Sequence, residues 1–243
     1  MATAAAAHPI TFWDITPAPG GCPFAQRAWL ALEELGVPYD HKLADPQNKP
    51  KEFTDLYASI VQNTDDSAKV PTIIDGEIKL TESLVVVEYL DAKYGGDSPI
   101  LPQDPGQLAK VKLFAELFTS KFQSLFFKIL RAGSDDEVAQ LKQDFAHNLE
   151  VLNNFIKISG SSEGGSYFLG SRYSYAETVT TPFLRRALVT LPHFKRVDPL
   201  EIAKSKGLDR LVDWIQASLD RDSNKKTGPS DEDIIESFKK FIT

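Results

Sequence analysis

The chain has 243 residues, 42% of them hydrophobic, which is enough to build the buried cores of one large or two small domains. Its formal net charge of -7 argues against nucleic-acid or anionic-membrane partners, because phosphate binding needs Lys and Arg to replace counterions. The single cysteine, Cys22, excludes an internal disulfide, a C-x-x-C pair and the multi-cysteine zinc patterns, so we expect no metal site and a reducing compartment.

We expect no secretory signal at the start of the chain. The opening MATAAAAHPI lacks a basic start and a sustained apolar segment, and no later apolar run approaches membrane-spanning length. We therefore expect a cytoplasmic protein that has no membrane partner. A short organelle-targeting role for the Ala-rich start is the alternative.

The first part of the chain alternates short apolar segments with helical ones. Strands are predicted at 10–15, 39–43, 70–74 and 77–80, and helices at 22–36, 49–60 and 82–95. Pro23 and Gly36 mark the start and the end of the first helix, and Asp75-Gly76 is a hairpin turn signal. The order β-α-β-α-β-β-α predicts a mixed sheet with helices packed on it.

A stretch rich in Gly, Pro and Asp follows, and after it the pattern becomes helical. Ser-x-x-Glu capping boxes begin at Ser134 and Ser174, and further amphipathic helices are predicted at 207–219 and 231–242. The predicted organisation is an α/β domain over residues 1–95, a linker over 96–107 and an all-helical domain over 108–243.

Cys22 lies where a thiol can gain reactivity. An ordinary thiol titrates at about pH 8.5, but the unpaired N–H groups and the dipole at a helix start favour the thiolate. Arg27 adds positive charge if its side chain folds back toward the sulfur. The alternative is a small buried hydrophobic residue, the usual fate of a lone cysteine. Without a second cysteine, a disulfide formed on Cys22 must be resolved by an external thiol.

The segment KVPTIIDGEIKLTES, residues 69–83, offers parts of a binding site for a thiol-bearing peptide. A cis bond before Pro71 would turn the backbone of Val70 toward an extended ligand. Glu82 and Ser83 open a helix whose N–H groups and hydroxyl can hold a carboxylate. Taken singly, these residues are better explained by helix capping or by the start of an edge strand.

A family resemblance rests on several motifs taken together: CPFAQRAW, NKPKEF, KVPTI, ESLVVVEYLDAKYG and YSYAETVTTPFLRR. They resemble cysteine-type cytosolic glutathione transferases, closest to the omega and lambda classes, with dehydroascorbate reductases nearby. The resemblance covers nearly the whole chain. It implies the glutathione transferase fold, with a thioredoxin-like N-terminal domain that binds glutathione and an all-α C-terminal domain that completes the co-substrate pocket. It also implies a homodimer.

The resemblance gives roles to the residues around the thiol. Cys22 is implied as the catalytic thiolate that forms a mixed disulfide with glutathione. Pro71 is implied as a cis-proline, and Val70 as the backbone partner of the cysteinyl part of glutathione. Glu82 and Ser83 are implied to hold the γ-glutamyl end.

Two more residues are implied at the edge of the glutathione site. Lys49 matches a position that contacts the glycine carboxylate, which suits a point charge in a partly wet groove. Phe24 lies beside Cys22 in a packing role. Residues 57–70 are longer and more acidic than the corresponding family turn, so we expect a reshaped loop beside the site.

Aromatic residues of the helical region are candidates for the co-substrate pocket. Phe118 and Phe122 recur at helical spacing and, with Trp214, could receive a flat apolar co-substrate. Most such stripes belong to the core, and we expect this of at least two of the phenylalanines at 114, 118 and 122.

The function that these observations favour is glutathione-dependent thiol transfer or dehydroascorbate reduction through Cys22, acting on a small disulfide or an oxidised acceptor. One alternative is conjugation of glutathione to electrophiles. The other is a glutathione-binding carrier module without turnover.

Overall fold

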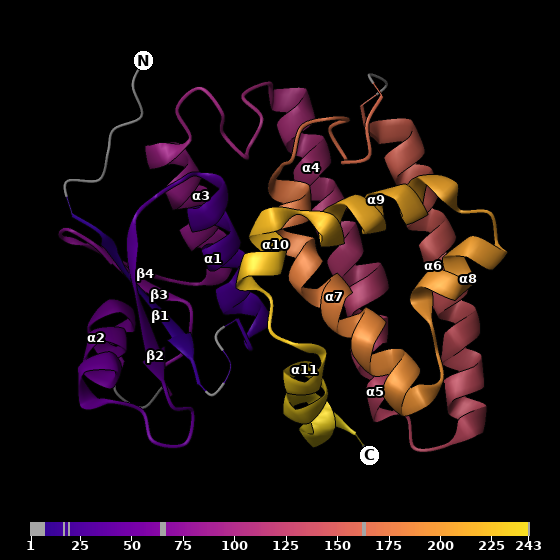
Figure 1. The fold of residues 1–243 in the computed structure, drawn as a ribbon, viewed down its shortest axis with the longest axis horizontal. Coiled ribbons are helices and arrows are strands. Elements are labelled where there is room, and N and C mark those ends of the chain that lie inside the picture. Colours follow the sequence, from indigo (N-terminus) through magenta and orange to yellow (C-terminus); the bar gives the residue numbers. More distant parts are fainter. Residues whose placement is uncertain (1–7, 17, 19, 64–66, 162–163, 243) are drawn as a thin grey trace. The chain divides into compact units, whose positions relative to one another are not determined.

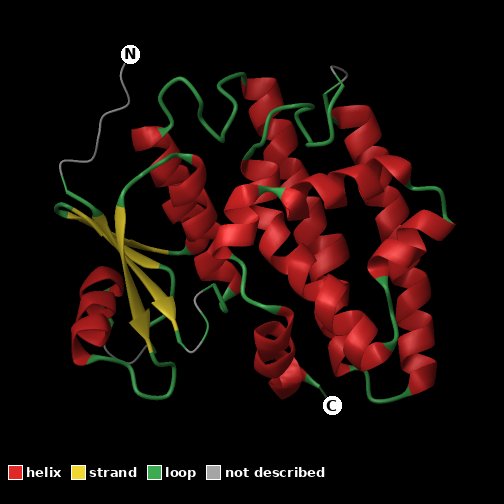
Figure 2. Cartoon of the chain, viewed as in Figure 1, coloured by secondary structure: helices red, strands yellow, loops and turns green. Residues whose placement is uncertain are grey.

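The structure is a computed structural model that describes residues 8–16, 18, 20–63, 67–161 and 164–242. The described residues form two compact units. The first contains those up to Leu101 together with Lys225–Pro229, and the second contains Pro102–Asn224 and the residues from Ser230 onward. Strands named in the sheet occur only in the first unit, and the second is built from helices (Figure 2), which confirms the predicted fold class.

The first unit follows the predicted order of elements (Figure 1). In the described residues it contains β1 (Ile10–Ile15), α1 (Pro23–Glu34), β2 (Tyr39–Ala44), α2 (Lys51–Val61), β3 (Thr72–Asp75), β4 (Ile78–Thr81) and α3 (Ser83–Tyr94). The sheet order is β2-β1-β3-β4, with β1 parallel to β2 and the other pairs antiparallel. The predicted mixed sheet is therefore confirmed.

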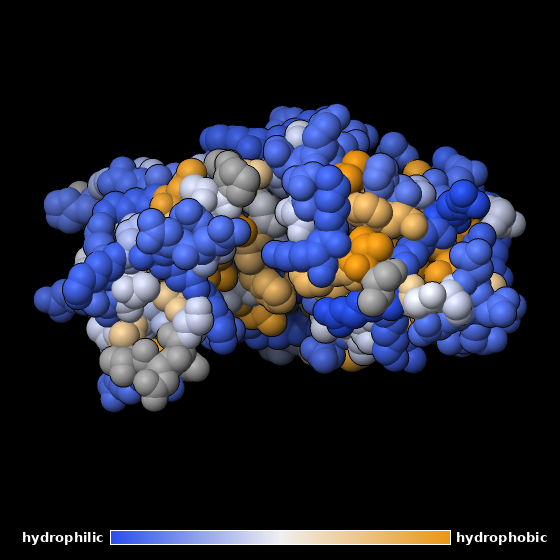
Figure 3. Space-filling view, turned by 90° about the horizontal axis from the view of Figure 1, so that it is seen from below, coloured by the Kyte–Doolittle hydropathy of each residue, from blue (hydrophilic) through white to orange (hydrophobic). Residues whose placement is uncertain are grey.

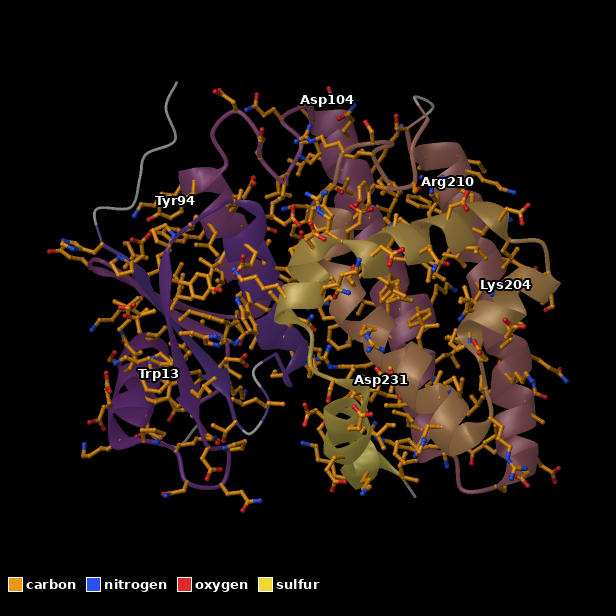
Figure 4. The ribbon with its side chains drawn as sticks, viewed as in Figure 1. Trp13, Tyr94, Asp104, Lys204, Arg210 and Asp231 are labelled. Atoms are coloured by element: carbon orange, nitrogen blue, oxygen red, sulfur yellow. The ribbon has the colours of Figure 1, made fainter. Side chains whose placement is uncertain are left out.

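Alternation along β1 sends neighbouring aromatic rings to opposite faces of the sheet. The ring of Phe12 lies 6.4 Å from that of Trp29 on α1, whereas the ring of Trp13 lies 5.0 Å from that of Phe53 on α2. Figure 4 labels Trp13 between the sheet and α2. Helices α1 and α2 thus cover opposite faces, and each contributes to a buried aromatic layer.

The second unit is mostly helical in its described part, with isolated β-bridges between Tyr167 and Gly170 and between Leu169 and Arg172. It contains α4 (Pro105–Leu117), the π-helical turn η1 (Phe118–Gln123), α5 (Ser124–Arg131), α6 (Asp135–Ser159), α7 (Tyr175–Lys195), α8 (Pro199–Ser205), α9 (Asp209–Asp220), α10 (Asp222–Thr227), α11 (Asp231–Phe238) and the 3₁₀ turn η2 (Lys239–Phe241). The last residues of α10 belong to the first unit.

The boundary between the units, after Leu101, falls inside the stretch predicted as linker, over 96–107, but a helix begins before that stretch ends. Helix α4 begins at Pro105, with Asp104 as its N-cap, inside the stretch predicted as linker. Proline fits the first position of a helix, because its missing N–H is not needed there. The return of Lys225–Pro229 to the first unit was not predicted either.

The two predicted capping boxes differ. In α7, Ser174 and Glu177 form the closed box, with the Ser174 N–H donating to the Glu177 carboxylate at 3.0 Å. In α6, Ser134 accepts from the Glu137 N–H at 3.2 Å, but the Glu137 carboxylate accepts from the Gly133 N–H. The prediction is therefore confirmed for α7 and only half met for α6.

The face shown in Figure 3 is mostly hydrophilic, with apolar residues in scattered groups. None of the described helices combines the length and the apolar character needed to cross a bilayer.

Candidate functional site

The sheet topology brings the predicted site residues to one of its ends. Parallel β1 and β2 finish together, with Ile15 opposite Ala44. Antiparallel β3 begins at this end and β4 finishes there, because Thr72 pairs with both Trp13 and Thr81. The chain segments that follow β1, β2 and β4 and precede β3 therefore share one end of the sheet.

Cys22 lies in the first of these segments, as the N-cap residue of α1. Its backbone is extended, with φ -81° and ψ 118°, and Pro23 takes the first turn of the helix. Its carbonyl accepts the first helical hydrogen bond, from the Gln26 N–H at 3.0 Å. The thiol residue is half-buried. A sulfur at this position lies at the positive end of the helix dipole, which favours a negative charge.

The segment before β3 contains the predicted cis peptide bond, between Val70 and Pro71. Pro71 is buried, and its carbonyl accepts from the Thr81 hydroxyl at 3.0 Å. The Val70 side chain packs against the cluster that includes Trp13 and Phe53. The cis geometry expected at Pro71 is thus confirmed, and its surroundings hold it against the sheet.

The segment after β4 carries an unusual backbone conformation. Glu82 has φ +69° and ψ 111° and an exposed side chain, and Ser83 is buried as the first residue of α3. A non-glycine residue in such a conformation costs on the order of 1–3 kcal/mol, and such residues cluster at ligand sites. The strained position and the start of a helix coincide where a carboxylate was predicted to bind.

Arg27 connects the first helix to this helix start. Its Nη1 donates to the Ser83 Oγ at 3.4 Å, and its guanidinium carbon lies 5.4 Å from the centre of the Phe24 ring. The sequence left open whether Arg27 folds toward the sulfur, and its guanidinium lies at Ser83. Because arginine only donates, the Ser83 oxygen accepts, and its own proton can point toward a ligand oxygen. Phe24 is 43% exposed beside this contact.

Lys49 lies in the segment after β2. Its Nζ donates to the Ser67 Oγ at 2.5 Å, so the ammonium group lies beside the chain leading to Val70. The long loop predicted over 57–70 begins within the last turns of α2. The C-cap of that helix, Gln62, lies in the left-handed region, with φ +53°. Residues 64–66 of that loop lie outside the described residues.

The candidate co-substrate residues are buried in the second unit. Phe118, Phe122 and Trp214 are at most 1% exposed, and the first two rings stack with their centres 4.5 Å apart. The Trp214 Nε1 donates to the Glu177 Oε1 at 2.8 Å. Their burial places these rings in the core of the helical unit, as expected for at least two of the phenylalanines. Side chains this buried do not line an open pocket for a co-substrate.

Two residues near Cys22 were not predicted from the sequence. Asp14 is fully buried at the end of β1 and accepts from the Gly20 N–H, and Thr227 accepts from the Gln26 side chain. The sequence offered one signal for Asp14, because it is an acidic residue near the end of an apolar strand and shortly before a glycine. Thr227 is 201 residues from Gln26 in the sequence, so no local pattern could indicate it.

The family described as "Glutathione S-transferase, N-terminal domain" matches residues 20–98. A probable glutathione S-transferase DHAR1, cytosolic, from Oryza sativa subsp. japonica is 30% identical over 96% of this chain and 92% of its own length. The chain belongs to the glutathione S-transferase family.

Other members of the glutathione S-transferase family match over similar lengths. Glutathione S-transferase U19 from Arabidopsis thaliana is 25% identical over 90% of this chain and 93% of its own length. The crystal structure of glutathione transferase Omega 2C from Trametes versicolor aligns with a TM-score of 0.73 at 28% identity, over 96% of this chain and 99% of that one. The omega-class and DHAR similarities agree with the resemblance read from the motifs. In the described residues, no three His, Cys, Asp or Glu side chains gather as metal ligands.

Proposed function

We propose that this glutathione S-transferase is a cysteine-type thiol transferase that forms a mixed disulfide between Cys22 and glutathione. The observation that carries the proposal is the position of the only cysteine, at the N-cap of α1 and at the sheet end that also holds the cis Val70–Pro71 bond. The helix amides favour the thiolate, which is the nucleophilic form of the thiol. A cysteine that served only as a small apolar residue would need no such position.

The same sheet end provides contacts for the rest of the peptide. The backbone of Val70 pairs with the cysteinyl part of glutathione, and the start of α3 at Glu82 and Ser83 holds the γ-glutamyl carboxylate. Lys49 binds the glycine carboxylate through its ammonium group. In doing so it gives up its hydrogen bond to the Ser67 hydroxyl. Phe24 packs beside the bound peptide.

The reaction is a pair of thiol–disulfide exchanges. The Cys22 thiolate attacks the glutathione sulfur of a glutathionylated substrate, the S–S bond breaks, and the substrate leaves as a thiolate that takes a proton. A second glutathione, as thiolate, then attacks the glutathione sulfur of the mixed disulfide. Oxidised glutathione leaves and the Cys22 thiolate is restored. With dehydroascorbate, two glutathione molecules supply the two electrons and end as the disulfide. The helix start and the peptide contacts contribute by ionisation and positioning.

We also infer a homodimer that acts in the cytoplasm. Ile78 on β4 and Leu84 and Val85 on α3 are 40–52% exposed, and exposed apolar groups of this kind mark protein interfaces. The rice relative is named as cytosolic, although the Arabidopsis DHAR3 relative is named as chloroplastic. Sedimentation of the purified chain at twice the monomer mass would support the dimer, and monomer mass at micromolar concentration would contradict it.

Substitution of the thiol tests the proposed function. We expect Cys22→Ser to reduce disulfide exchange with hydroxyethyl disulfide and dehydroascorbate reduction to the uncatalysed rates, in steady-state assays with glutathione. Cys22→Ala is the matched control: it also lacks the thiol but offers no hydroxyl, so conjugation of an electrophile that appears only in Cys22→Ser belongs to the hydroxyl. Exchange retained by either variant would contradict the proposal. Glutathione binding without turnover in the unsubstituted protein would identify a carrier instead.

A further inference from the structure

The backbone just before Cys22 is held by a buried carboxylate. The Gly20 N–H donates to Asp14 Oδ2 at 2.6 Å, and the Ile15 N–H donates to Asp14 Oδ1 at 2.8 Å. Asp14 thus ties the end of β1 to the residue two positions before the thiol. Gly20 has φ +73°, a left-handed conformation that glycine adopts without steric cost.

The burial of Asp14 calls for a physical reason. Its side chain is fully buried, and a carboxylate in such a place is costly unless hydrogen bonds compensate for the lost water. An apolar residue would serve the packing of β1 at no such cost. Two backbone N–H groups bind the carboxylate, and His41 Nε2 lies 3.4 Å from its Oδ2. The carboxylate therefore serves to fix the backbone that leads to Cys22.

A distant segment closes on Gly20 from another side. A Cβ added to Gly20 would lie 2.0 Å from the carbonyl oxygen of Thr227, closer than any real contact. Thr227 is fully buried, and its Oγ1 accepts from Gln26 Nε2 at 3.3 Å. Lys226 Nζ lies 2.7 Å from Glu33 Oε2, so the segment is attached along two turns of α1. Figure 1 shows the end of α10 beside α1.

We infer that Asp14 and Thr227 are positioning residues for the thiol, which clamp Gly20 and so keep the Cys22 sulfur at the amide end of α1. This inference rests on the proposed function of Cys22. The Gly20 clamp consists of Asp14, Gly20 and Thr227. It acts through the backbone, since Gly20 and Gly21 set the direction from which the chain enters the helix.

The experiment compares Gly20→Ala with Gly36→Ala in the full chain. Gly36, at the other end of α1, has a similar φ of +63°, but nothing lies within 4 Å of an added Cβ. Both variants place an alanine at a left-handed φ, and only Gly20→Ala collides with Thr227. The readout is the rate of iodoacetamide alkylation against pH, which reports Cys22 alone because the chain has one thiol.

The two variants should separate clearly. We expect Gly20→Ala to move the inflection of the alkylation profile toward that of an ordinary thiol. Alkylation at pH 7 should slow roughly tenfold or more, because only about 3% of an ordinary thiol, with a pKa of about 8.5, is ionised at pH 7. Gly36→Ala should keep the original profile.

A second pair of variants keeps the test decisive if Gly20→Ala fails to fold. Thr227→Val removes the hydroxyl that Gln26 binds, whereas Thr227→Ser keeps it, so only the valine variant should slow alkylation. Unchanged profiles in Gly20→Ala and Thr227→Val, beside an unsubstituted protein with a low inflection, would overturn this inference alone. An unsubstituted protein that titrates like a free thiol would overturn the proposed function and the inference together.

Discussion

At the residue scale, the proposed contact with the γ-glutamyl carboxylate depends on single side chains at the start of α3. Ser83 is buried, accepts from Arg27 at 3.4 Å and begins the helix directly after the strained Glu82. Its hydroxyl proton is thereby directed away from the guanidinium, toward whatever oxygen approaches the helix start. Ser83 therefore contributes both a helix amide and an oriented hydroxyl to the proposed γ-glutamyl contact.

Removal of this hydroxyl should weaken the binding of glutathione more than the chemical step. We expect Ser83→Ala to raise the KM for glutathione roughly fivefold with little change in kcat, because one lost hydrogen bond is worth about 1 kcal/mol. Steady-state kinetics at varied glutathione concentration measures this. Ser134→Ala, which removes a helix-capping hydroxyl from α6, is the matched control and should leave KM as it was. An equal rise in both variants would show that general loss of stability, and no direct contact, is responsible.

At the scale of elements, the hairpin and α3 are joined by one carboxylate. Asp75, at the end of β3, accepts through Oδ2 from Tyr89 OH at 2.6 Å, Lys93 Nζ at 2.7 Å and Tyr94 OH at 2.8 Å. Burial would raise the pKa of Asp75, but the hydrogen bonds from Lys93, Tyr89 and Tyr94 outweigh it and hold the pKa below its usual value. The contacts fix the far end of α3, and thereby the direction in which its first residues face.

The lowered pKa of Asp75 gives a pH dependence of stability. Its contribution is fully present above the pKa of an unfolded aspartate, at about 4, and is lost as pH falls through the lower folded value. We expect Asp75→Asn to lower the free energy of unfolding by about 2 kcal/mol at pH 7, with the difference shrinking below pH 4. Urea titrations across this range measure it. The exposed Asp40 provides the control, because Asp40→Asn should follow the unsubstituted curve. A difference that stays constant down to pH 2 would contradict this account of the carboxylate.

At the scale of the whole molecule, one buried carboxylate accepts hydrogen bonds from several elements of the helical unit. In the helical unit this group is Glu177, whose carboxylate accepts from Phe168 N at 2.7 Å, Trp214 Nε1 at 2.8 Å and Ser174 N at 3.0 Å. Burial raises the pKa of Glu177, and the hydrogen bonds, which lower it, offset only part of this effect. These contacts join α7, α9 and the chain before α7, so the packing of these elements depends on them.

Replacement of Glu177 should therefore act on the helical unit. We expect Glu177→Gln to cost about 2–4 kcal/mol of unfolding free energy, since the amide presents donors to groups that are themselves donors. Chemical denaturation measures this, and alkylation of Cys22 in the folded variant should keep its rate because the thiol lies in the first unit. Glu137→Gln, at the exposed start of α6, should cost less than about 1 kcal/mol. Equal losses in the two variants would contradict the role given to the buried network.

The sequence predicted the parts of the fold and site that depend on neighbours along the chain. The strand at 10–15, the hairpin around Asp75-Gly76 and the helix start at Cys22–Pro23 have local signals, and the structure has them at those places. The cis bond at Pro71 followed from the family motif. Local chemistry and motif together were enough for the elements and for the candidate thiol.

Other features depend on contacts between distant residues and were not predictable from local patterns. Helical spacing gives the same stripe for a core ring and for a pocket ring, so only burial assigned Phe118, Phe122 and Trp214 to the core. The contact of Gln26 with Thr227 spans 201 residues, and the partner of Arg27 lies on another helix. Which distant residues meet in such pairs depends on tertiary packing, which local sequence patterns do not reveal.

The central claim is that Cys22 accepts glutathione as a mixed disulfide, and mass spectrometry of the intact protein tests it most directly. After incubation with oxidised glutathione at neutral pH, we predict one glutathione per chain, located on Cys22 by peptide mapping and removed by excess reduced glutathione. Chain unfolded in urea and treated in the same way is the control for the intrinsic reactivity of the thiol. An unmodified folded protein beside a modified unfolded chain would contradict the claim, because the fold would then shield the thiol from the peptide.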